Sequence, residues 1–231
     1  MSRFPRRLRA VIFDLDGTLV DTADEFVVVV QALRAEHGLE PMDAGRIRQT
    51  VSNGARALVT LGLGLAEDHP HFEDRRLRLL ELYSEVLGST ARTYPGIPPL
   101  LKELQARGIA WGVATNKPRA YAAPLRQALQ LMEANPGKHD RCQSLVCPDD
   151  VKDRKPHPES LYLNCREINC APHEAIYIGD HLRDVEAGRR AGMYTIAAGY
   201  GYIEPDDDPV SWGADALADC STDLAQLIFD N

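Results

Sequence analysis

The spacing of apolar residues changes twice along this chain. A continuous apolar run over residues 10–13 is typical of a buried parallel strand, and it leads directly to Asp14 and Asp16. From residue 21 to residue 94 the apolar spacing is helical, and a turn signal at residues 94–96 ends this region. Beyond that turn, short apolar runs alternate with helical segments. The pattern therefore predicts a helical insertion that directly follows the first strand.

The alternating part of the chain predicts a parallel sheet. The apolar runs predict strands over residues 109–114, 144–147, 175–178, 194–197 and 215–218. The intervening segments predict helices over residues 98–107, from residue 118, from residue 158, from residue 183 and up to residue 229. Because strands that alternate with helices pair in parallel through right-handed crossovers, the fold class that we predict is α/β.

The insertion is predicted to contain helices and no strand. Asp21 or Thr22 is placed to cap its first helix, and residues 52–54 interrupt its second. Its fourth helix covers residues 72–87. The helical spacing predicts a buried face on this helix that is formed by Leu77, Leu80, Tyr83, Val86 and Leu87.

The composition excludes several classes of function. The formal net charge of -8 argues against a protein that binds the nucleic-acid backbone, since such a protein needs a basic surface. We see no apolar stretch long enough for a secretory signal or a membrane span, so no membrane partner is expected. The five cysteines are an odd number, and their spacing favours free thiols over a disulfide framework or a zinc site. These features predict a cytoplasmic protein.

Four short polar motifs lie at or near the ends of predicted strands. They are the pair Asp14 and Asp16, the segment Thr115-Asn116-Lys117, the dipeptide Lys155-Pro156, and Gly179-Asp180 with Asp184. Each motif alone is common, since an acid at a strand end often only caps a helix. Open α/β sheets bind ligands beyond the carboxyl ends of their strands. Taken together at that edge of one sheet, the four motifs indicate a single site.

The acids among these motifs suit the transfer of a phosphoryl group. A phosphate monoester is a dianion, so a nucleophile approaches it against negative charge, and Mg²⁺ held by carboxylates removes that repulsion. We expect Asp14 to bind the metal and to attack the phosphorus, which gives an aspartyl-phosphate. Asp16 is expected to bind the metal through its backbone carbonyl, to protonate the leaving oxygen and then to activate water. Asp180 is expected to complete the metal site.

Three further side chains are expected to bind the phosphoryl group itself. The Thr115 hydroxyl and the Asn116 amide would donate hydrogen bonds to its oxygens. Lys155 would balance the negative charge that spreads over those oxygens in the transition state. Asp184, one helical turn after Asp180, is placed to orient Lys155 or a metal-bound water.

These motifs resemble those of the haloacid dehalogenase-like hydrolase superfamily. The segment from Asp14 to Thr18 is similar to its first motif, Thr115 to its second, Lys155 to its third, and Gly179-Asp180-x-x-x-Asp184 to its fourth. The resemblance covers essentially the whole chain. It implies a Rossmannoid core of residues 1–20 and 95–231 with a helical cap of residues 21–94. His181 departs from it, because the family often has a small polar residue there; this imidazole either reaches the substrate or metal or is partly exposed.

Membership of the superfamily does not by itself define the reaction. A carbon–halogen dehalogenase needs no general acid, so Asp16 argues against that activity. Phosphonate-cleaving relatives use a lysine of the cap, and residues 21–94 contain none. A sugar phosphomutase and a non-catalytic phospho-aspartate switch domain stay open as less favoured alternatives to a phosphomonoester hydrolase.

The cap is expected to select the substrate. In residues 52–56, a loop enters a helix that carries Arg56. We expect Arg56 to pair with a carboxylate on the substrate; the alternative is an exposed helix arginine with no such role.

Local stretches divide the resemblance between two groups of phosphatases. Residues 112–118, 147–152, 200–205 and 212–215 are more similar to the N-acetylmuramic acid 6-phosphate phosphatases of bacterial cell-wall recycling than to phosphoglycolate phosphatases. The resemblance implies hydrolysis of N-acetylmuramic acid 6-phosphate in peptidoglycan recycling, a branch of carbohydrate metabolism, with 2-phosphoglycolate as the alternative substrate. Trp212 is either an apolar platform beside the substrate or part of the core. The expected partner is a small phosphorylated molecule that carries a carboxylate, bound by a monomer or a small homo-oligomer.

Overall fold

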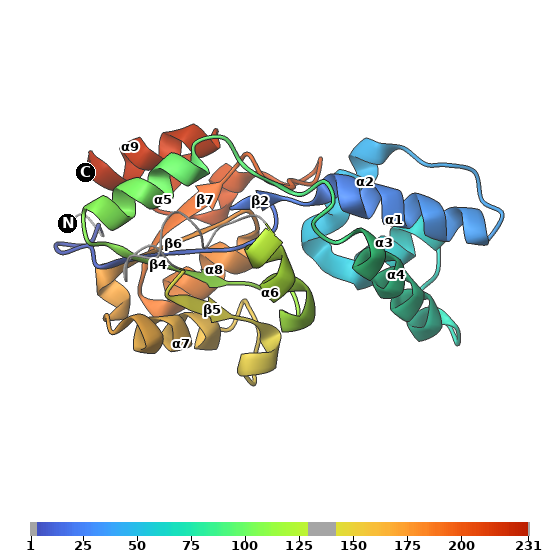
Figure 1. Cartoon of the computed structure of the whole chain (residues 1–231), viewed down its shortest axis with the longest axis horizontal. Coiled ribbons are helices and arrows are strands. Elements are labelled where there is room, and N and C mark those ends of the chain that lie inside the picture. The colour runs from blue at the N-terminus through green and yellow to red at the C-terminus, as the bar shows by residue number, and fades with distance from the viewer. Residues whose placement is uncertain (1–3, 129–141, 231) are drawn as a thin grey trace.

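The computed structural model describes residues 4–128 and 142–230, which form a sheet lobe and a helical lobe (Figure 1). Within these residues, one sheet contains six parallel strands in the order β5-β4-β1-β6-β7-β8. The strands are β1 (Ala10–Phe13), β4 (Ala110–Ala114), β5 (Ser144–Val146), β6 (Ala175–Gly179), β7 (Tyr194–Ala198) and β8 (Ala216–Ala218). The predicted α/β class is confirmed, and each predicted strand is present with small shifts at its ends.

Helices cover both faces of the sheet because its strands are apolar on both sides. In β1, Val11 and Phe13 pack into one apolar cluster, whereas Ala10 and Ile12 pack into another cluster on the opposite face. The first cluster is covered by α5 (Ile97–Ala106), α6 (Arg119–Ala128) and α9 (Leu224–Phe229), and the second by α7 (Glu159–Ile168) and α8 (Leu182–Ala191). The central strand is therefore fully buried, which fixes the position of the residues that follow it.

The helical lobe has an apolar core of its own. Its helices are α1 (Ala23–Glu36), α2 (Ala44–Thr50), α3 (Gly54–Leu63) and α4 (Phe72–Val86), and the 3-10 turn Val51–Asn53 joins α2 to α3. The predicted face of α4 is partly wrong: Tyr83 is buried, but so is Leu79, and Leu77 is 48% exposed. The leucines of α4 fit more than one helical face, and packing against α1 and α3 selects the face that contains Leu79.

The expectation of an insertion without strands is wrong at its edges. Strand β2 (Val20–Asp21) pairs antiparallel with β3 (Arg92–Thr93), so a two-stranded ribbon joins the lobes. The ribbon forms where the chain leaves and re-enters the sheet lobe. Strands of two residues are too short to show an alternating pattern in the sequence. The cap boundary that we propose at residue 21 falls inside this ribbon.

The strand order brings three chain segments to one point at the edge of the sheet. β1 lies between β4 and β6, and the strands after it extend outward in opposite directions on its two sides. Ligands of open α/β sheets bind at such a switch point, beyond the carboxyl ends of the strands. The residues that directly follow these three strands are Asp14, Thr115 and Asp180.

The structure also bears on the predictions about disulfides and membrane-spanning segments. The five cysteines, all of them described, form no disulfide, as predicted. Among residues 4–128 and 142–230, no helix combines the length and the apolar character that a membrane span requires.

Candidate active site

Asp14 and Asp180 lie side by side at the carboxyl ends of neighbouring strands. The ladder between β1 and β6 continues through Asp14, whose N–H donates to the Ile178 carbonyl oxygen at 2.8 Å. Gly17 allows the loop after β1 to pass over Asp180: it has a φ of 75°, and a Cβ at this position would collide with the Asp180 carboxylate. The Gly-Thr turn of the first motif is therefore required by the close approach of these two segments.

Lys155 is a buried cation held by two acids. Its side chain is 1% exposed, and its Nζ lies 2.9 Å from Asp14 Oδ1 and 2.7 Å from Asp184 Oδ1. The ammonium also donates to the Ala114 carbonyl oxygen at 2.8 Å and to the Tyr177 hydroxyl at 2.9 Å. Burial alone lowers the pKa of Lys155, but the two carboxylates outweigh it and the net shift is upward. The amine is therefore a permanent positive charge beside Asp14.

Asp14, Asp180 and Asp184 form one acidic cluster. Carboxylate oxygens of the three residues lie within 4.8 Å of one another. Burial raises the pKa of Asp180 to about 8, and the charges of Asp14 and Asp184 add to this shift. Burial likewise raises the pKa of Asp14 to about 6, although the charge of Lys155 opposes it. Three carboxylates around one ammonium leave a net negative charge in the cluster.

The acidic cluster has the composition of a divalent cation site. The buried atoms Asp180 Oδ1 and Asp184 Oδ2 accept no hydrogen bond from the part of the chain that the structure describes. Buried carboxylate oxygens without a partner are costly, and a hard cation such as Mg²⁺ binds ligands of this kind. The residues present therefore fit the metal that the first and fourth motifs imply.

Asp16 is held by residues of both lobes. Lys117 Nζ lies 3.0 Å from Asp16 Oδ1 and donates to the Tyr83 hydroxyl of α4 at 2.7 Å. The Thr22 hydroxyl also donates to Asp16 Oδ1 at 2.7 Å. Lys117 lies within the second motif, but its position there does not predict this role. Nothing in the sequence pairs it with an acid at the end of another strand.

The helical lobe reaches Asp180 through Ser52. Ser52 Oγ donates to Asp180 Oδ2 at 2.8 Å, and the same oxygen accepts the Tyr202 backbone N–H at 3.0 Å. The break in helical spacing at residues 52–54 was a signal for this loop, although we associated it with Arg56. The contact of Tyr202 with Asp180 could not be predicted from the residue type, because its donor is the backbone N–H.

Thr115 and Asn116 follow β4 at the same edge of the sheet. Thr115 is buried, and its hydroxyl oxygen accepts the Lys117 N–H at 3.1 Å. Asn116 Nδ2 donates to the Lys155 carbonyl oxygen at 3.1 Å. These bonds shape the loop and join it to the Lys155 segment; the role of both side chains in binding phosphate stays a prediction.

Arg56 is already ion-paired within the helical lobe. Its Nε lies 2.7 Å from Glu67 Oε2 and its Nη1 lies 3.6 Å from Glu73 Oε2, while the guanidinium lies over the Phe72 ring at 4.9 Å. Its side chain is 45% exposed. Within the described ranges, no contact joins Arg56 to the acidic cluster, and its predicted role in substrate binding stays a prediction.

A polar network joins the two lobes beside Asp180. Asn53 Oδ1 accepts a hydrogen bond from Arg183 Nη2 at 3.0 Å and lies 3.2 Å from His181 Nε2. Asn53 Nδ2 donates to Glu204 Oε1 at 2.8 Å. Burial, together with the charge of Arg183, lowers the pKa of His181 to about 4, so the imidazole is neutral near pH 7. The His181 ring contacts both lobes, since its Nδ1 accepts the Arg183 N–H of the sheet lobe at 3.1 Å.

Trp212 is packed in the core. It is 4% exposed and packs with Val185 and Ala197, and its Nε1 donates to Asp207 Oδ1 at 2.7 Å. Of the two interpretations of this residue, the structure supports packing beneath the loop.

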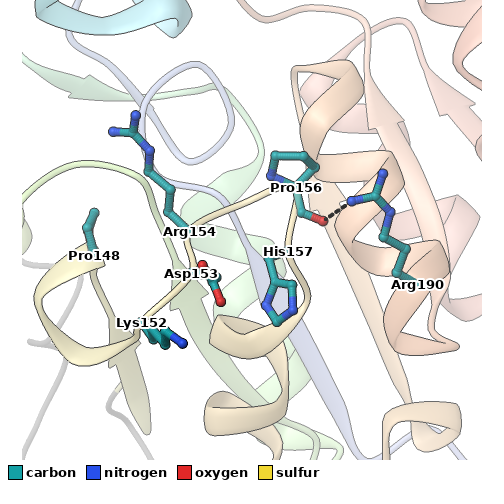
Figure 2. A pocket seen from close by; sticks show the side chains of 7 residues that line it. All are labelled: Pro148, Lys152, Asp153, Arg154, Pro156, His157 and Arg190. Atoms are coloured by element: carbon teal, nitrogen blue, oxygen red, sulfur yellow. Dashed lines mark hydrogen bonds between the residues drawn. The ribbon is translucent and has the colours of Figure 1, made fainter.

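A surface hollow of about 470 Å³ lies beside the segment that carries Lys155 and is distinct from the acidic cluster (Figure 2). It is lined by Pro148, Lys152, Asp153, Arg154, Pro156, His157 and Arg190. None of the predicted site residues lines it. Figure 2 shows Lys152 and Arg154 pointing in different directions rather than toward a common centre. The hollow therefore shares no residue with the predicted site, and its cations Lys152 and Arg154 do not converge on one point.

The chain is similar to known proteins of two groups of phosphatases. The family described as haloacid dehalogenase-like hydrolase matches residues 11–198. The N-acetylmuramic acid 6-phosphate phosphatase of Pseudomonas aeruginosa is 46% identical over 96% of this chain and 95% of that protein. A phosphoglycolate phosphatase of Xanthomonas campestris pv. campestris is 38% identical over 94% of this chain and 93% of that protein.

A solved structure has the same architecture. The crystal structure of a predicted phosphoglycolate phosphatase from Haemophilus somnus 129PT matches with a TM-score of 0.80, over 98% of this chain and 99% of that one, at 24% identity. At this identity the likeness shows the fold alone. The match of the family to most of the sequence shows more: this chain belongs to the haloacid dehalogenase-like hydrolase family.

Proposed function

We propose that this protein is a Mg²⁺-dependent phosphomonoester hydrolase that acts through an aspartyl-phosphate on Asp14. The arrangement around Asp14 carries the proposal. Its Oδ1 accepts the Leu15 N–H at 2.7 Å and lies 2.9 Å from the Lys155 ammonium. Both contacts go to the same oxygen, which orients the carboxylate and leaves Oδ2 for attack on the phosphorus.

Lys155, Thr115 and Asn116 are proposed to bind the transferring phosphoryl group. The Lys155 ammonium is fixed by its bonds to the sheet lobe before any substrate arrives. A charge that is already in place stabilises the transition state without reorganisation. The hydroxyl of Thr115 and the amide of Asn116 lie on the loop beside it and supply neutral donors for the remaining oxygens.

Asp16 is proposed as the general acid and base. In the first step its carboxyl group gives a proton to the leaving alcohol oxygen as Asp14 bonds to phosphorus. In the second step the Asp16 carboxylate accepts a proton from the water that attacks the aspartyl-phosphate, and inorganic phosphate and free Asp14 are formed. The bonds from Thr22 and Lys117 hold this carboxylate in position from both sides.

Asp14, Asp180 and the backbone carbonyl of Asp16 are proposed to hold the Mg²⁺ ion. When bound, the ion offsets the negative charge of the carboxylate nucleophile and of the phosphate that it attacks. Asp184 is proposed to position Lys155, since their atoms lie 2.7 Å apart.

The proposed substrate is N-acetylmuramic acid 6-phosphate, which places the reaction in peptidoglycan recycling in the cytoplasm. The support for this choice is the higher identity to the Pseudomonas aeruginosa enzyme of that name, 46% against 38% for the phosphoglycolate phosphatase of Xanthomonas campestris. The alternative substrate is 2-phosphoglycolate. Both molecules carry a carboxylate in addition to the phosphate ester.

Phosphate release from a panel of substrates tests the proposal. We expect the value of kcat/KM for N-acetylmuramic acid 6-phosphate to exceed those for 2-phosphoglycolate and glucose 6-phosphate by at least about tenfold. A higher value for 2-phosphoglycolate would favour the alternative. Transfer of phosphate between sugar hydroxyls, with little release of free phosphate, would indicate a phosphomutase.

Asp14→Asn tests the covalent route. The amide keeps the shape of the side chain but is a poor nucleophile, so kcat is expected to fall by at least about 10⁴-fold while the fold is retained. Phosphate release measures the loss, and circular dichroism checks the fold. Asp219→Asn, at an exposed position on the sheet lobe, is the matched control. Activity of the Asp14 variant within about tenfold of the unmodified enzyme would contradict this mechanism.

A further inference from the structure

Arg183 is a cation between the lobes that the proposed chemistry does not use. It lies in the first turn of α8, between Asp180 and Asp184. Its Nη2 donates to Asn53 Oδ1 at 3.0 Å, and Asn53 follows Ser52, whose hydroxyl donates to Asp180 Oδ2 at 2.8 Å. The guanidinium therefore binds the residue next to the one that touches the acidic cluster, on the side that the helical lobe covers.

Arg183 forms no ion pair with any acid in residues 4–128 and 142–230. Two acids of the loop at residues 204–208 are engaged by other donors: Glu204 Oε1 accepts from Asn53 Nδ2 at 2.8 Å, and Asp207 Oδ1 accepts from Trp212 Nε1 at 2.7 Å. A guanidinium has five N–H donors, and its fork matches the two oxygens of a carboxylate. The half-buried guanidinium is therefore available for an anionic ligand.

Arg56, in contrast to Arg183, already has acid partners. Its guanidinium is paired with Glu67 and Glu73 and lies over the Phe72 ring. A substrate carboxylate would have to compete with both glutamates for it. Of these two arginines, Arg183 is thus the one for which the described residues supply no acid partner.

We propose that Arg183, rather than Arg56, determines substrate specificity by binding the carboxylate on the leaving group of the substrate. This inference rests on the proposed phosphatase function. In N-acetylmuramic acid 6-phosphate, the lactyl carboxylate and the phosphate ester are attached to the same sugar ring. A cation between the lobes binds the carboxylate while Asp14 attacks the phosphorus.

A pair of sugar phosphates that differ only in the lactyl ether isolates this interaction. The unmodified enzyme is expected to prefer N-acetylmuramic acid 6-phosphate over N-acetylglucosamine 6-phosphate. In Arg183→Gln, we expect KM for the first substrate to rise by about 10- to 100-fold, while KM for the second changes by less than about threefold. The kcat values are expected to change little, because the carboxylate contact is made equally in the ground state and the transition state. Arg183→Lys should restore part of the preference, because it keeps the charge but not the fork.

Two further variants separate carboxylate binding from a role in holding the lobes together. Asn53→Ala removes the hydrogen bond between Asn53 and Arg183 and leaves the cation, so it should affect both substrates by the same factor. Arg189→Gln, an exposed position on the same helix, should affect neither.

Specific outcomes would overturn the inference. An equal loss on both substrates in Arg183→Gln would overturn it, as would an unmodified enzyme without preference. If the unmodified enzyme releases phosphate from neither sugar, the proposed function fails first, and the inference with it.

Discussion

The two sides of the proposed active site are held in different ways. On the sheet side, Lys155 bonds Asp14 and Asp184, and all three residues belong to the sheet lobe. On the helical side, single hydrogen bonds cross from one lobe to the other, as from Ser52 to Asp180. The first set of contacts is complete within one folded unit. The second set exists only while the lobes are together.

The difference indicates which part of the chemistry each side serves. The buried ammonium and carboxylates need fixed positions, because electrostatic stabilisation is largest when the charges do not have to reorganise. A substrate that is enclosed between two lobes must also enter and leave, so we expect contacts such as those of Tyr83 with Lys117 and of Asn53 with Arg183 to break and re-form.

Among the changes that test the contrast between the two sides, Lys155→Met should have the largest effect, because it removes the cation of the sheet side. Methionine fills a similar volume but leaves Asp14 and Asp184 buried without a positive partner. We expect kcat to fall by about 10²- to 10³-fold and the free energy of unfolding of the metal-free protein to fall by roughly 3–5 kcal/mol. Phosphate release and urea unfolding at pH 8 measure the two effects.

Lys152→Met is the control for this prediction, since Lys152 is exposed on the neighbouring loop. It should leave both quantities close to those of the unmodified protein. A Lys155 variant that loses activity with unchanged stability would show that the buried ion pairs do not hold the sheet side together.

Magnesium should stabilise the protein more at high pH than at low pH. Burial raises the pKa of Asp14 to about 6 and that of Asp180 to about 8. An acid whose pKa is raised by folding favours the folded state below its ordinary pKa, and this contribution is lost as the pH rises through the raised value. The metal-free protein should therefore lose stability between about pH 4 and pH 8. Mg²⁺ binds the ionised carboxylates and should offset that loss.

Thermal unfolding with and without Mg²⁺ measures this effect. At a Mg²⁺ concentration of about 100 times Kd, the expected rise in Tm is about 5–10 °C at pH 8 and much smaller at pH 5. Asp180→Asn should remove most of the shift. Asp153→Asn, in the exposed acidic group with His157 and Glu159, should not change it. An equal shift at both pH values would place the bound ion outside the acidic cluster.

The meeting of Asp14 and Asp180 on the sheet side could be predicted from the sequence because each residue directly follows a strand. The apolar run of β1 predicts where Asp14 lies, and the strand Ala175–Gly179 does the same for Asp180. Parallel strands bring these ends to one edge whatever the length of the chain between them. The sequence pattern therefore predicts both the fold class and the approach of these two acids.

The helical side could not be predicted in the same way. The contact of Ser52 with Asp180 depends on how the helical lobe is oriented on the sheet lobe, which no spacing of residues encodes. The contact of Arg183 with Asn53 depends on the same orientation. In the sequence, Arg183 has the pattern of an ordinary surface arginine on an amphipathic helix. Arg56 stood out because it follows a loop, but its glutamate partners come from a turn and a helix farther along the chain.

Ser52→Ala should have the smallest effect, and it tests the helical side directly. Asp180 Oδ2 loses the bond from the hydroxyl but keeps the one from the Tyr202 N–H. We expect kcat/KM to fall by roughly three- to tenfold, with a change of less than about 1 kcal/mol in the free energy of unfolding. Ser52→Thr retains a hydroxyl and should recover most of the activity. The loss should be the same for substrates with and without a carboxylate, because the serine acts on the acidic cluster rather than on the leaving group. A loss as large as that of Lys155→Met would mean that the helical side is as firmly built as the sheet side, and that the contrast between them is not functional.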